Sequence, residues 1–458
     1  MSDLFRFGKK DKPVLGHDSD LDADTLDGLH AAELISKARR GSGGGAADGE
    51  DSFTFMVRTR GNEVIARDAF STTRFHDPDG STVTQAAIDA MSVGDSLLIK
   101  GIVKLPSPLV GKHGIVIKAE NWFSGFEASA AMARMIDLRS LGYGEFCHLR
   151  NLFFDGKNLA TVIVDADLTA APSVTFTEVD HCYIRDATGA LVVGSYNDNL
   201  RIKNGTVLAG CDAAYATHSQ RGVYVAAVDG MIHLDNVTVS YFTVAGTDIS
   251  ATRAEYRNVV YSGYTPTQGQ AALRAGQHAF YGGWLEYTTG TPLAPLIKGS
   301  SDSVPSAEIH GTTAGINSAT YPVIGGQFDS LRLYGGQYTQ AGAHAYSISG
   351  TMNDLKVLGS KLVNKYVDVS AITRYNILLD GLPYTWISNL EKSGVATGTG
   401  IEQEIDHGLA GTPTNVMLSA KDSGVTALCE GTTAHNSSHI YVVCTSGKQF
   451  RWRARMEA

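Results

Sequence analysis

One short pattern recurs along the middle of the chain and limits what the chain can fold into. An apolar residue is followed by any residue, an Asn and an alternating apolar run, as in HLRNLFFDG (148–156), NLRIKNGTVLAG (199–210) and EYRNVVYSG (255–263). Ten such positions, some with substitutes for Asn, are spaced by about 25 residues on average. They are Asn151, His181, Asn204, Asn236, Asn258, Gly283, His310, Gly336, Ser360 and Asp380. A repeat of this length indicates stacked units, because one unit alone cannot bury its apolar residues.

The secondary structure expected within each repeat indicates the fold. Each period holds short strands and turns without a helical run, which excludes α-solenoids, and a propeller blade needs about 40–45 residues. Glycine is abundant, 50 of 458 residues, as many tight turns require. The sequence therefore predicts an all-β protein built on a right-handed parallel β-helix of about ten coils. An Asn at a coil corner tolerates left-handed backbone geometry and bonds neighbouring backbone, so we interpret the Asn column as structural.

Composition shifts divide the chain into five segments. Residues 1–40 form a small head, acidic and then helical, and 41–52 form a flexible linker rich in glycine. In 53–123, apolar residues at helical spacing around 83–91 predict a helix that caps the first coils. The β-helix occupies 124–383. Residues 384–458 read as a small antiparallel β domain for trimerisation or glycan binding, with Trp452 and its arginine neighbours on a basic aromatic face.

Charge and composition exclude several classes of protein. The net charge of −9 argues against a nucleic-acid partner, and no apolar stretch approaches the 18 residues of a membrane span. The start of the chain has no signal-peptide core, so we expect synthesis in the cytoplasm without a secretion signal. Alternating aspartates at 18–24 suggest a calcium loop, but Ala23 and Leu29 stand where an EF-hand needs Gly and Glu. We therefore expect no metal and no cofactor.

Three segments resemble proteins of known families. HDPDGSTVTQAAIDAMSVGDSLLIKGIVKLPSPLVGKHGIVIKAE (76–120) resembles the first coil of pectate-lyase-superfamily β-helices. DADTLDGLHAAEL (22–34) and EIDHGLAGTPTNVMLSA (404–420) are similar to segments of phage tail fibres and tail proteins. The set looks like a tailspike or tail fibre of a virus of bacteria or archaea. This resemblance implies a homotrimer in the virion tail, attached to a tail or baseplate protein through residues 1–40, whose β-helix meets the host's surface polysaccharide.

Candidate catalytic residues follow from the spacing of carboxylates. Glycosidic hydrolysis needs two carboxylates about 5–10 Å apart, and on a β-helix such neighbours lie two residues apart or one coil apart. Asp165 and Asp167 in VIVDADLTA meet the first condition. EVDHCYIRD (178–186), the densest ionisable patch of the array, adds Asp180 and Asp186 beside an arginine, as a lyase would need. The alternative, which we favour, is that an exposed coil face simply carries polar residues.

Candidate glycan-binding residues are aromatic, because the C–H face of a sugar packs on a ring. Tyr241, Tyr264, Trp284 and Tyr287 lie within 47 residues, on about two coils. The alternative is that some of them belong to the core or to a trimer interface.

Three functions remain open from the sequence. The first is a trimeric receptor-binding tail fibre or tailspike that binds surface polysaccharide. The second is a depolymerase on the same β-helix that cleaves this polysaccharide as a hydrolase or a lyase, which leaves enzymatic activity undecided. The third, a non-viral β-helix polysaccharide enzyme, is disfavoured by the missing secretion signal, the N-terminal head and the C-terminal β domain.

Overall fold

The computed structural model describes residues 53–455, with gaps at 143, 168–175, 196–198, 211–218, 227–229, 264–265, 288–291, 319, 341–346, 364–366, 368–375, 381–390 and 410–411. The predicted head, the linker and the alternating aspartates lie outside the described residues. The described residues all belong to one compact unit, Phe53–Ala458.

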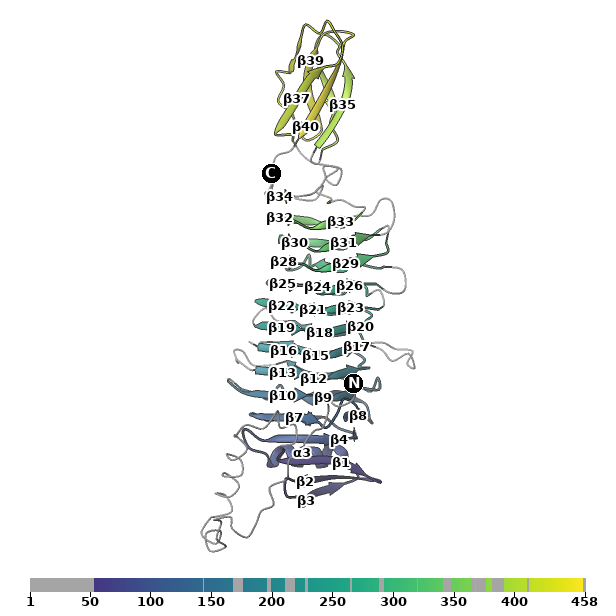
Figure 1. Cartoon of the computed structure of the whole chain (residues 1–458), viewed down its shortest axis with the longest axis vertical. Helices are drawn as coiled ribbons and strands as arrows, with labels where there is room; N and C mark the ends of the chain where they lie inside the picture. The colour runs from purple at the N-terminus through teal and green to yellow at the C-terminus, as the bar shows by residue number, and fades with distance from the viewer. Residues whose placement is uncertain are drawn as a thin grey trace, which may run out of the picture. The chain divides into compact units, whose positions relative to one another are not determined.

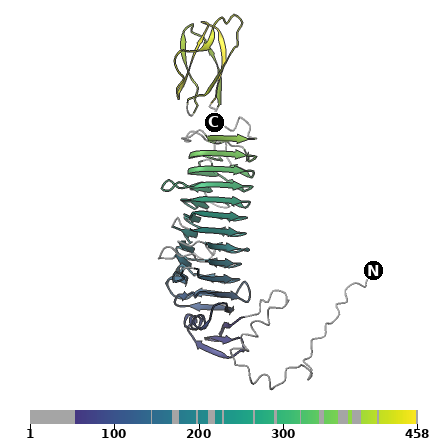
Figure 2. The ribbon, with the colours of Figure 1, turned by 90° about the vertical axis from the view of Figure 1, so that its left-hand side faces the viewer.

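Parallel strands wind through the central part of the chain as a stack of coils, each of which visits sheets A, B and C in turn (Figures 1 and 2). The eleven strands of sheet B match the expected number of about ten coils, and the predicted parallel β-helix is confirmed. After β1 (Phe55–Arg60), which pairs parallel with the first of them, the parallel strands of sheet A are β4 (Ser96–Lys100), β7 (Ile115–Ala119), β10 (Phe146–Arg150), β13 (Phe176–Asp180), β16 (Asn199–Lys203), β19 (Met231–Asp235), β22 (Arg253–Arg257), β25 (Gln277–Tyr281), β28 (Ser306–His310), β30 (Ile324–Tyr334), β32 (Thr351–Leu358) and β34 (Asn376–Asp380).

Sheets B and C complete each coil. Sheet B contains β5 (Ile102–Leu105), β8 (Gly125–Ala128), β11 (Phe153–Asp155), β14 (Tyr183–Arg185), β17 (Val207–Ala209), β20 (Thr238–Ser240), β23 (Val260–Ser262), β26 (Trp284–Glu286), β29 (Thr313–Ile316), β31 (Gln337–Gln340) and β33 (Lys361–Val363). Sheet C contains β6 (Leu109–Val110), β9 (Met132–Asp137), β12 (Ala160–Asp167), β15 (Ala190–Ser195), β18 (Arg221–Val225), β21 (Ala245–Ile249), β24 (Ala271–Leu273), β27 (Ile297–Gly299) and the first residues of β30.

The core follows from alternation along each strand. Side chains at every second position of sheet A point inward, and strand register places equivalent positions above one another at about 4.8 Å. One such inward column, fully or almost fully buried, runs through Ile117, Leu149, Val179, Ile202, Leu234, Tyr256, Phe280, Ile309, Leu333 and Val357. Its residues belong to a single apolar cluster that extends through the stack.

The corner between sheets A and B explains the recurring Asn. Asn151, Asn204, Asn236 and Asn258 all have positive φ, between 50° and 57°, as does His181. The backbone N–H of each donates to the carbonyl that precedes the corner of the next coil, so the predicted column exists. The side chains bond different partners: Asn151 Nδ2 donates to the Ala119 carbonyl, and Asn204 Nδ2 donates to Asp180 Oδ1.

In the coils after residue 280, each corner lies one residue away from its predicted position. The corner positions there are Gly282, Gly311, Gly335 and Gly359, each with φ between 64° and 68°, rather than Gly283, His310, Gly336 and Ser360. Glycine replaces Asn because both tolerate this backbone conformation. Because glycine also occurs at many other turns, it does not identify these corners in the sequence. The predicted corner positions therefore differ from the observed ones by one residue.

The expected helix, α3 (Gly80–Ala90), covers the first coils. The Asp79 carboxylate accepts hydrogen bonds from the backbone N–H groups of Ser81 and Thr82, at 2.7 and 3.1 Å, and so caps the helix. Val83, Ala87 and Ile88 are buried against the strands, among them β1 (Phe55–Arg60), β2 (Glu63–Asp68) and β3 (Thr73–Asp77), which pair antiparallel with one another. No helix of the described residues is long and apolar enough to cross a membrane.

The last strands form two antiparallel sheets. One contains β35 (Glu391–Thr397), β37 (Asn415–Ala420) and β40 (Gln449–Arg455), and the other contains β36 (Glu402–Asp406), β38 (Leu428–Glu430) and β39 (His439–Cys444). Trp452 is 8% exposed and belongs to their shared core, whereas the flanking arginines of β40 point outward. The expected basic aromatic face therefore contains the arginines but not Trp452. Side chains alternate along the strand, so Trp452 points into the core and its arginine neighbours point to solvent.

Candidate functional site

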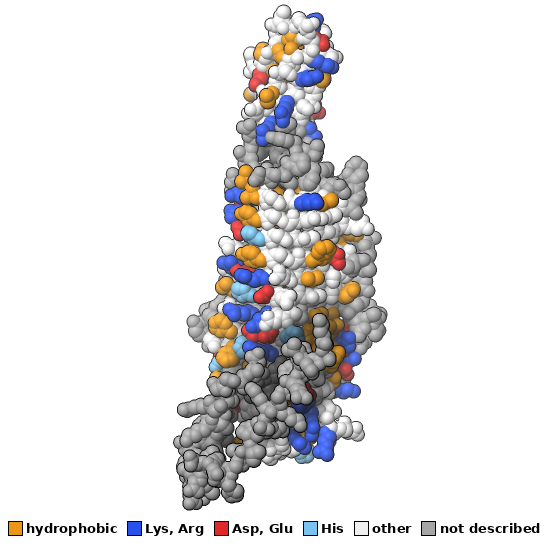
Figure 3. All heavy atoms as spheres, in the orientation of Figure 1, with side chains coloured by type: hydrophobic (Ala, Val, Ile, Leu, Met, Phe, Trp, Pro, Cys, Tyr) orange, Lys and Arg blue, Asp and Glu red, His pale blue; other side chains and the backbone are white. Residues whose placement is uncertain are grey.

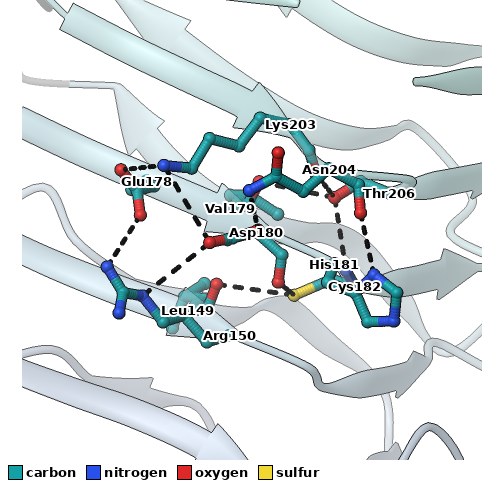
Figure 4. Close-up of polar contacts among 10 residues, drawn as sticks. All are labelled: Leu149, Arg150, Glu178, Val179, Asp180, His181, Cys182, Lys203, Asn204 and Thr206. Carbon is teal, nitrogen blue, oxygen red and sulfur yellow. Dashed lines mark hydrogen bonds and ion pairs between the residues drawn. The ribbon is translucent and has the colours of Figure 1, made fainter. Parts of the chain in front are cut away.

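The outer face of sheet A holds the predicted residue Asp180 in an ionic network (Figure 4). Glu178 lies between Arg150 of the coil before and Lys203 of the coil after, with O···N distances of 3.0 and 2.9 Å. Asp180, two residues further along β13, is 3.9 Å from both cations. Burial would raise the pKa of Glu178, but the hydrogen bond and charge of Lys203 outweigh it and lower this pKa. Glu178 therefore stays ionised and is not a general acid near neutral pH.

At the neighbouring corner, the polar side chains form hydrogen bonds with the backbone. His181 Nδ1 lies 2.8 Å from the Asn204 carbonyl oxygen, and the Thr206 hydroxyl donates to the Lys203 carbonyl at 2.7 Å (Figure 4). Burial raises the pKa of Cys182 to about 12, so this thiol is not a nucleophile at neutral pH. The network around Asp180 links three adjacent coils through ion pairs.

Asp186 does not join Asp180. It follows β14 in sheet B, whereas Asp180 ends β13 in sheet A, so the coil corner separates them. Asp186 is fully buried with a φ of 59°, and Arg185 Nε lies 3.4 Å from its carboxylate. Arg185 also binds Asp155 at 2.8 Å. The segment 178–186, compact in sequence, is thus divided between two sheets.

Asp165 lies in a second ionic cluster, on the outer face of sheet C. Its register partner on the preceding coil is Asp137, about 4.8 Å away along the stack. Arg134 Nε is 2.8 Å from the Asp165 carboxylate, and Arg139 Nε is 3.0 Å from that of Asp137. Asp167, the other predicted residue of β12, donates its backbone N–H to Asp165 Oδ1 at 3.1 Å.

The two register partners have opposite pKa shifts. Burial raises the pKa of Asp165. Burial acts in the same direction on Asp137, but hydrogen bonds and charge from Arg139 outweigh it and lower the pKa of that carboxyl. Adjacent carboxyls with pKa values displaced in opposite directions can serve as acid and base. Sequence reasoning missed Asp137, although an Asp at the matching position one coil earlier was a usable signal.

The predicted aromatic residues are in different environments. Trp284 is 46% exposed and Tyr241 is 38% exposed. Tyr287 is half-buried, and its hydroxyl donates to the carbonyls of Ala294 and Pro295. Tyr264 lies outside the described residues.

A stacked aromatic column near Trp284 was missed. Tyr281, His310 and Tyr334 end successive strands of sheet A in register, and their ring centroids are 5.1 and 4.7 Å apart with interplanar angles of 17° and 18°. The Arg257 guanidinium lies 5.2 Å from the Tyr281 ring centroid. The signal in the sequence was an aromatic residue just before the corner in three consecutive coils.

Beside this column runs a strip without side chains. A Cβ atom added to Gly311, Gly335 or Gly359 would meet no atom within 4 Å, so these corners are open to solvent. On the other side, Trp284 belongs to an outward row of sheet B, in which Val260 precedes it in register and Thr313 and Gln337 follow. We call the surface formed by Tyr281, Trp284, Gly311, Gly335 and Tyr334 the corner strip. Figure 3 shows a largely white band over part of the β-helix, with hydrophobic and charged side chains on either side of it.

Comparison with known proteins finds structural similarity to phage tailspikes. The Dettilon tailspike protein gp208 gives a TM-score of 0.40 at 12% identity, covering 82% of this chain and 91% of that chain. The tailspike of Acinetobacter phage vB_ApiP_P1 gives 0.40 at 13%, covering 82% and 84%. The Gp54 tailspike of Acinetobacter baumannii bacteriophage AP22, solved in complex with a capsular saccharide, gives 0.29 at 10%, covering 83% and 93%.

Tailspike structures are among those to which the chain is similar. No protein-family model and no curated protein matches the chain. Similarity at this level of identity concerns the fold, and one fold can carry many functions.

Proposed function

We propose that this protein is a tailspike-type receptor-binding protein that binds a host cell-surface polysaccharide along the corner strip. The observation that carries the proposal is the combination of the exposed Trp284 ring and the edges of the Tyr281–His310–Tyr334 stack with side-chain-free corners. Sugars pack their C–H faces on aromatic rings, and a bare backbone surface lets a chain approach closely. Because the strip repeats once per coil, it suits a ligand that is itself a repeating polymer.

The assembly belongs to the same proposal. The three segments that resemble phage tail and β-helix proteins support a homotrimer located in the virion tail, attached to a tail or baseplate protein through residues 1–40. Residues 384–458 would then serve trimerisation or glycan binding.

The Asn corners of the earlier coils suggest a substitution that tests the strip without disturbing the fold. Asn occupies the same left-handed corner position at 204, 236 and 258, so Gly311→Asn and Gly335→Asn fit the backbone and add side chains only to the strip. We expect the double variant to keep its melting temperature and to bind polysaccharide at least about tenfold more weakly, which is about 1.4 kcal/mol. Binding is measured on immobilised surface polysaccharides extracted from a panel of bacterial strains.

The control is Asn236→Gly, which removes a side chain from a corner outside the strip and should leave binding unchanged. Undiminished binding by a folded Gly311→Asn, Gly335→Asn double variant would contradict the proposal.

A second candidate function, polysaccharide cleavage, is favoured by the Asp137–Asp165 pair. Asp165, with its raised pKa, would act as the acid and Asp137 as the base or nucleophile, because the two are register partners on adjacent coils and a glycosidase needs two neighbouring carboxylates. Asp165→Asn is expected to reduce the release of reducing ends at least about 100-fold while binding persists. Asp235→Asn, an exposed carboxylate of sheet A, is the control. Absence of cleavage by the unmodified protein, or equal cleavage by Asp165→Asn, would exclude this function.

A further inference from the structure

A cavity of about 290 Å³ opens on sheet C, where β24, β27 and β30 end or turn toward sheet A. Its charged and polar walls come from Asp248, Gln268, Arg274, Lys298, Asp302 and Gln327. The cavity is close to the lower limit of about 300 Å³ for small-molecule sites, so it suits one sugar unit rather than a length of polymer. It lies on a different sheet from the corner strip and around other residues than the Asp137–Asp165 pair.

Backbone keeps this cavity hollow. Gly299 and Gly326 line it on adjacent coils, and a Cβ on Gly326 would lie 2.3 Å from the Gly299 carbonyl oxygen. A Cβ on Gly299 would likewise lie 2.1 Å from the carbonyl oxygen of Gln327. Neither position can carry a side chain without moving a strand, so glycine is required at both.

The guanidinium groups beside the cavity are fixed in place. Asp248 is fully buried, and its carboxylate accepts hydrogen bonds from Arg221 Nε at 2.7 Å and from Arg274 Nη2 at 2.8 Å. The Arg274 side chain is 34% exposed, so it is held by Asp248 from within while remaining accessible from the cavity. One carboxylate between two guanidinium groups leaves an excess of positive charge.

Lys298 adds a second accessible cation. Within the part of the chain that the structure describes, it forms no ion pair, in contrast to Lys203 and Lys157, which bind carboxylates. Asp302 stands exposed at the rim and accepts a hydrogen bond from Ser301 at 3.2 Å. Among the residues that line the cavity, Arg274 and Lys298 balance Asp248 and Asp302, and Arg221, which binds Asp248, adds one positive charge nearby.

We propose that this cavity binds the carboxylate of an acidic sugar unit, such as a hexuronate or a nonulosonate, within the polysaccharide that the protein recognises. Lys298 and Arg274 donate charge-assisted hydrogen bonds to the sugar carboxylate, and Gln268 and Gln327 bond its hydroxyl groups. This inference rests on the proposed function, because it names the class of polysaccharide that the protein selects.

Short probes separate this site from the corner strip. Trigalacturonate, its carboxyl-reduced form and a sialic-acid-terminated trisaccharide are titrated calorimetrically against the full chain at low ionic strength, where charge-assisted contacts are strongest. We expect at least one acidic probe to bind and the reduced probe to bind at least about tenfold more weakly. Lys298→Gln should weaken acidic-probe binding about tenfold, whereas Lys104→Gln, an exposed lysine of β5, should change nothing.

The proposal is overturned if neither acidic probe binds, if the reduced form binds equally well, or if folded Lys298→Gln binds like the unmodified protein. The Gly311→Asn, Gly335→Asn double variant keeps the two proposals distinguishable. It should bind the short acidic probes as the unmodified protein does. A loss of polysaccharide binding at the strip and a loss of acidic-probe binding at the cavity are thus measured separately.

Discussion

Replacement of Asp248 by Ala is expected to lower the free energy of unfolding by about 3–5 kcal/mol. Asp248 is fully buried and is the shared partner of Arg221 and Arg274, so its removal leaves two guanidinium groups facing each other without a counter-charge. Partial exposure of both arginines places the expected loss toward the lower end of this range. Urea unfolding followed by circular dichroism measures the change.

Asp302→Ala is the control for this result. The Asp302 side chain is exposed on the same surface, and its loss should alter stability by less than about 0.5 kcal/mol. Equal stability of the Asp248→Ala and Asp302→Ala variants would show that the buried carboxylate does not hold these coils together.

Gly283→Ala is expected to destabilise the β-helix by about 3 kcal/mol, from left-handed strain and from overpacking together. Gly283 has a φ of +87°, and its added Cβ would lie 2.4 Å from the Val259 carbonyl oxygen of the preceding coil. Relief of this contact requires neighbouring coils to separate, which lengthens their hydrogen bonds.

Gly311→Ala provides a matched comparison at another corner. Its φ is +64°, but no atom lies within 4 Å of the added Cβ, so only the backbone strain of about 1 kcal/mol remains. The difference between the two melting temperatures isolates the packing of coil on coil. If both variants melt together, the close approach at Gly283 does not contribute to stability.

These predictions depend on features that differ in how visible they are in the sequence. The coil stack, the cap around Ala87 and the corner role of Asn204, Asn236 and Asn258 were predictable, because each depends on local backbone preference or on alternation within one strand. The displaced corners at Gly282 and Gly311 were not, since glycine is compatible with many turn positions and marks none of them.

The candidate site was only partly predictable for a related reason. Asp165 was identified, but its partner Asp137 lies one coil away, and loops of unequal length hide which residues become register partners. The same uncertainty concealed the stack of Tyr281, His310 and Tyr334. It also placed Asp180 with Asp186, which are close in sequence but belong to different sheets.

By itself the sequence determined that the chain winds into stacked coils with an apolar interior, because period and alternation act over a few residues and repeat. Only the tertiary structure decided which outward side chains meet, since that depends on register between strands about 25 residues apart. The corner strip and the cavity at Lys298 exist because three or more coils align, and a contact of that kind leaves no trace within any single repeat.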